Sequence, residues 1–312
     1  MRLGVLDVGS NTVHLLVVDA FRGGHPTPTH SSKSVLRLAE SITRSGSLSK
    51  DGEQSLIDAV ARAKKDARSE RCDDLLGFAT SAVRDASNSA AVLARVKRET
   101  GVELAVLTGP DEARLTFLAV RRWYGWSAGR LLALDIGGGS LEMAIGVDEE
   151  PELAISVPLG AGRMGREFLR GDPPDRKALA QLRKHAEETL TKPAEKIKAV
   201  GEVDRIVATS KTFRSLARLT GAAPSTAGPR ASRHLTLEGL GQLIGFISRI
   251  PSADLAELDG VSPTRSEQLL AGAVVAEVAM KMLGIGAVQI CPWALREGVI
   301  LRRLDWLEGD QQ

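Results

Sequence analysis

Near its start the chain reads Leu3-Gly4-Val5-Leu6-Asp7-Val8-Gly9-Ser10-Asn11-Thr12, and the pattern returns as Leu131-Leu132-Ala133-Leu134-Asp135-Ile136-Gly137-Gly138-Gly139-Ser140. In both stretches an apolar run typical of a buried strand delivers one aspartate into a glycine-containing turn, and a second apolar run follows. Asp7 aligns with Asp135, Gly9 with Gly137 and Thr12 with Ser140. Each stretch therefore predicts a hairpin with an acid at its tip.

The chemistry of these turns suits phosphate. Glycine lets the backbone approach a ligand closely and turn its N–H groups toward an anion, while a carboxylate at a strand end can hold a cation that bridges to phosphate oxygens. Neither turn is a P-loop, because no Gly-Lys-Ser/Thr follows, and neither fits the dinucleotide fingerprint, because the next segment reads as a strand. One such turn is usually only a turn. Two matching turns favour a phosphate site.

The repeat and the length of 312 residues predict two domains of ordinary size. Strand and helix patterns recur in both halves, so the predicted class is α/β, with duplicated domains facing each other across a cleft. The segment from Arg121 to Arg130 contains two glycines and is the predicted seam. We therefore assign residues 1–125 to an N-terminal domain and residues 126–312 to a C-terminal domain.

The composition indicates a globular protein without a membrane-spanning segment. Hydrophobic residues make up 43% and charged residues 26%, which is typical of a soluble globular protein. No secretion signal and no apolar run of membrane-spanning length is present, which predicts a cytoplasmic protein without a membrane partner. The two cysteines, Cys72 and Cys291, argue against a disulfide framework and are expected to be small buried residues. The histidines show no metal-ligand spacing, and His14 is expected to pack or to form hydrogen bonds.

The net charge of +2 does not indicate a nucleic-acid partner, although basic residues gather in one region. Between Arg205 and Leu237 the sequence contains no acidic residue and six basic ones: Arg205, Lys211, Arg214, Arg218, Arg230 and Arg233. Such a run is either a solvated face or a path for a polyanion. Elsewhere we predict a strand from Lys33 to Leu38 and a long helical region from Pro174 to Val200 that Pro193 kinks or divides.

Four motifs together resemble the exopolyphosphatase and guanosine pentaphosphate phosphatase family. They are Asp7 to Thr12, Gly109-Pro110-Asp111-Glu112-Ala113-Arg114, Asp135 to Ser140 with Glu142, and Arg296-Glu297-Gly298. That family belongs to the superfamily of actin, sugar kinases and heat-shock ATPases. The resemblance covers nearly the whole chain in the right order. It implies two ribonuclease-H-like domains facing across a central cleft, Mg²⁺ as cofactor and a homodimer.

The resemblance also implies roles for individual residues. Glu112 would orient and activate water, Asp7 and Asp135 would hold Mg²⁺, and Glu142 would position a metal-bound water or the nucleophile. The substrate-binding residues would be Gly9, Ser10, Asn11, Thr12, Arg84, Gly137, Gly138, Gly139, Ser140 and Lys211. Lys211 is well placed because it follows a predicted strand and opens a helix, whose N–H groups attract anions.

Each of these residues has a plainer interpretation. Either aspartate alone is more often a turn former, and Glu112 could be an acid that stabilises a helix start. Glu142 could face solvent from its strand. Arg114 could instead anchor Glu112 or Asp111. Arg163 and Arg265 are further candidates for binding phosphates, although solvated surface charges explain them as well.

Two departures from the family bear on the substrate. Where many relatives carry Ser-Gly-Thr, this chain has Thr209-Ser210-Lys211-Thr212, and a lysine there disfavours a nucleoside and favours a bare phosphate chain. The chain also stops at residue 312, without the C-terminal helical domains of larger relatives, which suggests short chains. We predict a Mg²⁺-dependent exopolyphosphatase that releases terminal orthophosphate from inorganic polyphosphate. The alternatives are a guanosine pentaphosphate 5′-phosphatase and, in another class, a non-catalytic sensor of polyphosphate or nucleotide.

Overall fold

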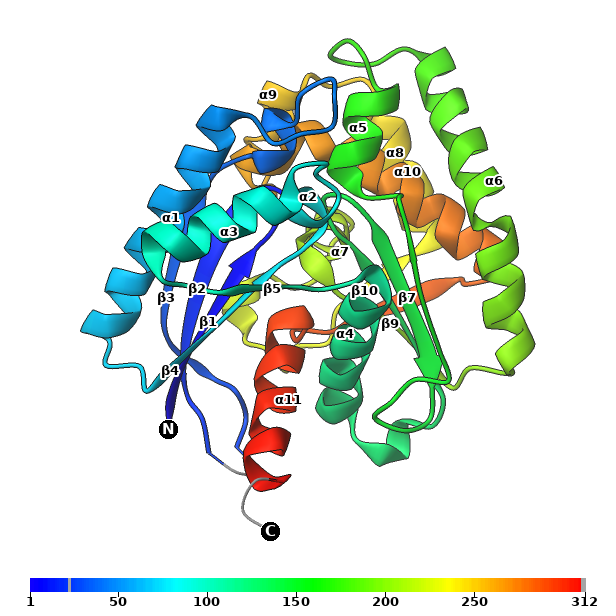
Figure 1. Cartoon of the computed structure of the whole chain (residues 1–312). Helices are drawn as coiled ribbons and strands as arrows, with labels where there is room; N and C mark the ends of the chain where they lie inside the picture. Colours follow the sequence, from blue (N-terminus) through cyan, green and yellow to red (C-terminus); the bar gives the residue numbers. More distant parts are fainter. Residues whose placement is uncertain (22–23, 310–312) are drawn as a thin grey trace. The chain divides into compact units, whose positions relative to one another are not determined.

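The computed structural model describes residues 1–21 and 24–309 (Figure 1). The chain forms two compact units, Met1–Leu115 with Leu295–Gln312, and Thr116–Ala294. This division differs from the predicted boundary between residues 125 and 126 in two ways. The change of unit falls inside helix α4 (Gly109–Tyr124), and the last helix, α11 (Leu295–Gly309), belongs to the first unit. The reason for the second difference is packing, because Ile300 of α11 is fully buried against strand residues of the first unit.

The first unit is built on a sheet with the strand order β3-β2-β1-β4-β5. Its strands are β1 (Arg2–Val8), β2 (Thr12–Asp19), β3 (Pro28–Val35), β4 (Asp74–Ala79) and β5 (Leu104–Val106). Strands β1, β2 and β3 are antiparallel, whereas β4 and β5 run parallel to β1. The helical segments of this unit are η1 (Leu38–Ser41), α1 (Lys50–Ser69), α2 (Ser81–Arg84), α3 (Ser89–Thr100), the start of α4, and α11.

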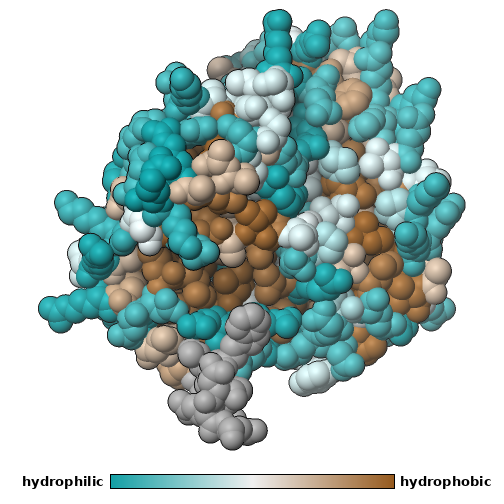
Figure 2. Space-filling view, viewed as in Figure 1, coloured by the Kyte–Doolittle hydropathy of each residue, from teal (hydrophilic) through white to brown (hydrophobic). Residues whose placement is uncertain are grey.

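Strand β1 lies at the centre of this sheet and is buried on both faces. Leu6 and Val8 pack in the cluster that includes α1, while Leu3 and Val5 pack in the cluster that includes Ile300 of α11. An apolar run of this kind is what a strand covered on both sides requires. Helices α1 and α3 lie side by side (Figure 1), and hydrophilic side chains project over α1 at the left of Figure 2. Helix α1 begins directly after Ser49, whose hydroxyl accepts from the Gly52 N–H at 3.2 Å.

The second unit is built on a sheet with the strand order β10-β11-β9-β6-β7-β8. Its strands are β6 (Leu131–Ile136), β7 (Leu141–Gly146), β8 (Leu153–Val157), β9 (Arg205–Ala208), β10 (His234–Thr236) and β11 (Ala287–Ile290). Its helical segments are the rest of α4, η2 (Trp126–Ala128), α5 (Ala161–Phe168), α6 (Arg176–Val200), α7 (Ser210–Leu219), η3 (Ser225–Ala227), α8 (Leu237–Ile247), α9 (Ser252–Leu255), η4 (Pro263–Arg265) and α10 (Ser266–Leu283).

The two sheets share one topology. In each unit the first three strands form an antiparallel meander, the fourth strand pairs parallel to the first, and one further strand, β5 or β11, lies parallel beside the fourth. Strand β10 is an addition at the edge of the second sheet. The predicted α/β class and the duplication are therefore confirmed, and both repeated turns join the first strand of their unit to the second.

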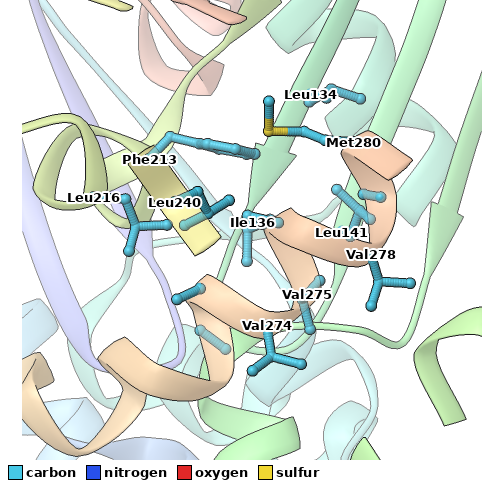
Figure 3. Packing of buried hydrophobic residues seen from close by; sticks show 14 of the residues in the cluster. Leu134, Ile136, Leu141, Phe213, Leu216, Leu240, Val274, Val275, Val278 and Met280 are labelled. Carbon is cyan, nitrogen blue, oxygen red and sulfur yellow. The ribbon is translucent and has the colours of Figure 1, made fainter. Parts of the chain in front are cut away.

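The core of the second unit is centred on α10, which is buried along most of its length (Figure 3). Val274, Val275 and Val278 of this helix lie near Ile136 of β6 and Leu141 of β7 (Figure 3). Helix α10 also packs against α5, α6, α7 and α8. The strands that carry the second turn are thus held by a continuous apolar layer.

Two local predictions differ from the structure. Strand β3 covers Pro28–Val35 rather than Lys33 to Leu38, because its pairing with β2 ends at Thr12 and Val35. As an edge strand it carries mainly polar residues, so its sequence lacks the apolar alternation that marks other strands. Pro193 does not divide the long helix, which is continuous as α6. The buried side chains of Leu190 and Ala194 on either side of Pro193 keep the helix packed on the core despite the lost hydrogen bond.

Candidate active site

The first turn is closed by its own backbone and buried. Gly9 donates its N–H to the Thr12 carbonyl at 2.9 Å, and Ser10, Asn11 and Thr12 are at most 9% exposed. The Ser10 hydroxyl lies 3.0 Å from the hydroxyl of Ser81, the first residue of α2. The turn is therefore fixed both by the hairpin and by the start of a helix.

The second turn has the same closure, because Gly137 donates to the Ser140 carbonyl at 2.9 Å. The first turn of α5 adds two bonds, from the Ala161 N–H to the Gly137 carbonyl and from the Arg163 N–H to the Gly138 carbonyl, both at 2.9 Å. The carbonyls of Gly137, Gly138 and Ser140 thus accept hydrogen bonds from the protein itself. An anion would be bound by backbone N–H groups of the turn.

Gly160 is a site residue that sequence reasoning missed. A Cβ atom at this position would lie 2.3 Å from backbone atoms of Gly139 and Ser140, a separation at which the turn would have to move. Only glycine therefore lets α5 begin directly against the second turn. Its signal in the sequence is a glycine immediately before a predicted helix, which alone is too common to identify a site.

Asp135 stands near the end of β6 and is hydrogen-bonded by the hydroxyl of Thr209. Burial raises the pKa of the Asp135 carboxyl, and the Thr209 hydroxyl, Arg214 and Arg265 oppose that shift. The charged carboxylate is therefore disfavoured by its surroundings unless more positive charge is supplied.

Glu142 is directly opposite Asp135 in the β6–β7 ladder, so both side chains lie on one face of the sheet. Its side chain is 5% exposed and accepts a hydrogen bond from the Ser156 hydroxyl at 2.9 Å. The alternative that Glu142 faces solvent is wrong. The second unit therefore places two carboxylates next to the glycine turn.

Glu112 lies in the first turn of α4 and is 8% exposed. Arg84, the last residue of α2, forms an ion pair with Glu112 and donates to the Leu107 carbonyl at 3.1 Å and to Asp85 at 3.0 Å. The guanidinium thus fixes the carboxylate to which the family resemblance assigns the activation of water. Sequence reasoning named both residues and did not foresee that they are partners.

Arg114 has a different partner. It forms an ion pair with Asp111 at 3.2 Å, and Asp111 also accepts from the Thr108 hydroxyl at 2.5 Å. Of the two structural roles considered for Arg114, the one toward Asp111 is confirmed. These contacts cap the start of α4, the element that presents Glu112.

Asp7 of β1 is opposite His14 of β2, and Arg296 of α11 reaches both. The Arg296 guanidinium contacts the His14 ring and lies 3.9 Å from Asp7 Oδ2. Burial, and then the charges of Arg296 and Lys33, lower the pKa of His14 to about 4. The imidazole is therefore neutral near pH 7, and the hydrogen-bonding role predicted for it is confirmed by its contact of 2.7 Å with the Ser31 hydroxyl.

A model described as the Ppx/GppA phosphatase family matches residues 17–306. The chain belongs to the Ppx/GppA phosphatase family. It is 64% identical to Exopolyphosphatase 1 of Mycobacterium tuberculosis over 305 residues, which covers 98% of this chain and 89% of that protein. The corresponding protein of Mycobacterium leprae is 61% identical and is covered to 90%.

Solved structures of this family share the fold. An exopolyphosphatase from Cytophaga hutchinsonii superposes with a TM-score of 0.87 at 25% identity, with 98% of each chain covered. The Ppx/GppA family member from Aquifex aeolicus gives a TM-score of 0.79 at 25% identity, also with 98% of each chain covered. The predicted two-domain, actin-like fold of ribonuclease-H-like domains is therefore confirmed.

The departure from the family at Thr209 to Thr212 has a backbone counterpart. Ser210 adopts φ +69°, a left-handed conformation that favours glycine and is strained for serine. Lys211 is exposed in the first turn of α7, as predicted, and lines a small cavity together with Arg265 and Gln268. The left-handed residue is thus Ser210, and Lys211 adds positive charge directly after it.

The basic run from Arg205 to Leu237 is mostly used inside the protein. Arg205 donates to Gln289 at 2.8 Å, and Arg218 pairs with Asp259. Arg233 donates to the carbonyls of a loop, among them that of Ala223 at 2.9 Å. The charges of Arg205, Arg218 and Arg233 therefore hold loops and strands together, whereas Lys211 and Arg230 are exposed.

Other predictions concern cysteine, metal and membrane. Cys291 is buried and Cys72 half-buried, and the two do not form a disulfide. Within residues 1–21 and 24–309, no group of three or more His, Cys, Asp or Glu side chains is arranged to hold a metal ion. In the same part of the chain, no helix is long and apolar enough to span a membrane.

Proposed function

We propose that this protein is an exopolyphosphatase that hydrolyses the terminal phosphoanhydride bond of inorganic polyphosphate and releases orthophosphate. The observation that carries this proposal is the 64% identity to Exopolyphosphatase 1 over 98% of the chain. The geometry supports it, because each unit presents a glycine turn beside an aspartate, and the first unit adds a buried glutamate at a helix start.

We propose that Glu112 orients and deprotonates the attacking water, so that no covalent enzyme intermediate is formed. Arg84 supports this role by fixing the carboxylate, in addition to the phosphate contact that the family resemblance implies for it. Glu142 would orient water near the second turn. Phosphate oxygens would be bound by Gly9 to Thr12, by Gly137 to Ser140 and by Lys211.

Phosphatases of this family generally depend on a divalent metal ion, and we propose Mg²⁺, held by Asp7 and Asp135. Asp135 fits such an ion because desolvation raises the pKa of its carboxyl, and a nearby cation favours the charged form. Mg²⁺ takes one or two carboxylates and completes its shell with water and phosphate oxygens, so a dense cluster of protein ligands is not required. The chemistry supplied by the bound ion is neutralisation of charge on the phosphoryl oxygens.

A guanosine pentaphosphate 5′-phosphatase is the second candidate. A guanosine-5′-triphosphate,3′-diphosphate pyrophosphatase of Aeromonas hydrophila is 27% identical over 95% of this chain, which spans 58% of that protein. The exposed charge of Lys211 next to the Ser210 turn favours a bare phosphate chain instead.

Phosphate release from polyphosphate of defined lengths, from guanosine pentaphosphate and from ATP tests the proposal. We expect turnover of polyphosphate to be fastest and to stop when a chelator removes the divalent ion. Faster turnover of guanosine pentaphosphate would place the second candidate first. Tight polyphosphate binding without release from any substrate would instead identify a sensor. Homodimer formation is a proposal from the family resemblance, to be checked by light scattering. A cytoplasmic location is a proposal from the sequence pattern, to be checked by cell fractionation.

A further inference from the structure

The tripeptide Ala-Thr-Ser occurs at residues 79–81 and again at residues 208–210. Each copy follows a strand that pairs parallel to the first strand of its unit, β4 with β1 and β9 with β6. Each copy also begins a helix, α2 or α7. The duplication therefore includes a second element besides the aspartate turns.

The two copies have the same backbone geometry at threonine. Thr80 has φ −115° and ψ −156°, and Thr209 has φ −120° and ψ −156°. Both threonines are buried, Thr80 at 7% and Thr209 at 0% exposure. A shared conformation at equivalent places indicates a shared task, which is to hold the end of the central strand.

In the first unit this task falls to Thr80 and Ser81. Thr80 donates both its N–H, at 3.1 Å, and its hydroxyl, at 3.4 Å, to the Val8 carbonyl, and the Ser81 hydroxyl reaches Ser10 in the turn. In the second unit Thr209 donates its N–H to the Leu134 carbonyl at 2.8 Å, and its hydroxyl donates to the Asp135 carboxylate. Only the second copy therefore aims a side-chain donor at an acid.

We propose that Thr209 is a positioning residue for the divalent ion, which it serves by fixing the rotamer of Asp135. Because the Thr209 hydroxyl donates a hydrogen bond to Oδ2 of Asp135, the carboxylate keeps one orientation. The other carboxylate oxygen, Oδ1, would then bind the metal. This inference rests on one part of the proposed function, which is that Asp135 binds the divalent ion. Partners of metal ligands typically control affinity in this way.

The strain at Ser210 is consistent with this role. Its left-handed backbone is needed where the strand ends and α7 begins directly after Thr209. The Ser210 carbonyl accepts from Arg214 Nε at 3.0 Å, which stabilises that conformation. Strained residues persist where the surrounding structure holds them, and here the strained residue directly follows Thr209, whose hydroxyl donates to Asp135.

The test uses Thr209→Val, which keeps the shape and removes the hydroxyl, and Thr209→Ser, which restores it. The matched control is Thr212→Val, because the buried Thr212 hydroxyl donates to the Ile136 carbonyl at 3.0 Å and not to an acid. Binding of Mn²⁺ to the substrate-free protein is measured by electron paramagnetic resonance, beside thermal unfolding and metal titration of phosphate release.

We expect Thr209→Val to weaken Mn²⁺ binding by about 10- to 100-fold, Thr209→Ser to recover most of the affinity, and Thr212→Val to leave it unchanged. Unaltered Mn²⁺ binding by Thr209→Val would overturn the proposal. So would an equal loss in Thr212→Val, or a native protein that binds no Mn²⁺. Since this measurement needs no substrate, it stays decisive even if polyphosphate proves not to be the substrate.

Discussion

Glu112→Gln is expected to lower phosphate release from polyphosphate by about 10²- to 10⁴-fold at saturating substrate and metal, the range typical of a lost general base. Glutamine keeps the size of the side chain and its hydrogen bonds but cannot accept a proton from water. The side chain is buried, so the amide stays near Arg84. Initial rates and thermal unfolding are measured on the same preparations.

The competing explanation is that Glu112 only neutralises Arg84. Asp85 and the Leu107 carbonyl continue to hold Arg84 in the variant, so a purely structural role predicts lower stability with most of the activity kept. The matched control is Asp111→Asn, an equal loss of charge in the same helical turn at a half-buried position. We expect Asp111→Asn to change the rate little. Equal rates for native protein and Glu112→Gln would remove Glu112 from the mechanism.

The repeated turns were predictable because their information is local. An apolar strand, an acid and a glycine turn are adjacent in sequence, and the structure places them as the β1–β2 and β6–β7 hairpins. The α/β class and the helix that presents Glu112 follow from equally local patterns. The roles of the site residues, by contrast, came from the family resemblance.

What could not be predicted depends on contacts distant in sequence. The ion pair between Arg84 and Glu112 joins the end of α2 to the start of α4. Gly160 is required because a Cβ atom there would lie 2.3 Å from the backbone of Gly139 and Ser140. The last helix belongs to the first unit through a contact of the same kind. The sequence of α11 alone does not indicate that Ile300 packs against β1.

Gly298→Ala is expected to destabilise the protein by about 3 kcal/mol or more, at the upper end of what overpacking costs. A Cβ atom at Gly298 would lie 1.9 Å from the Leu115 carbonyl oxygen, so α11 and α4 would have to separate. This displacement would also affect the candidate site residues of the first unit. Leu115 is one turn after Glu112, and Gly298 is two residues after Arg296, which contacts His14 and lies 3.9 Å from Asp7.

Thermal and denaturant unfolding measure this effect, and Gly241→Ala is the matched control. Gly241 lies inside α8 with open space where its Cβ would be, so alanine should stabilise the helix by up to about 1 kcal/mol. The same substitution is thus expected to act with opposite signs at two helical positions. A Gly298→Ala protein as stable as the native one would show that α11 and α4 can move apart at little cost, and then Arg296 would not depend on this crossing for its place beside Asp7.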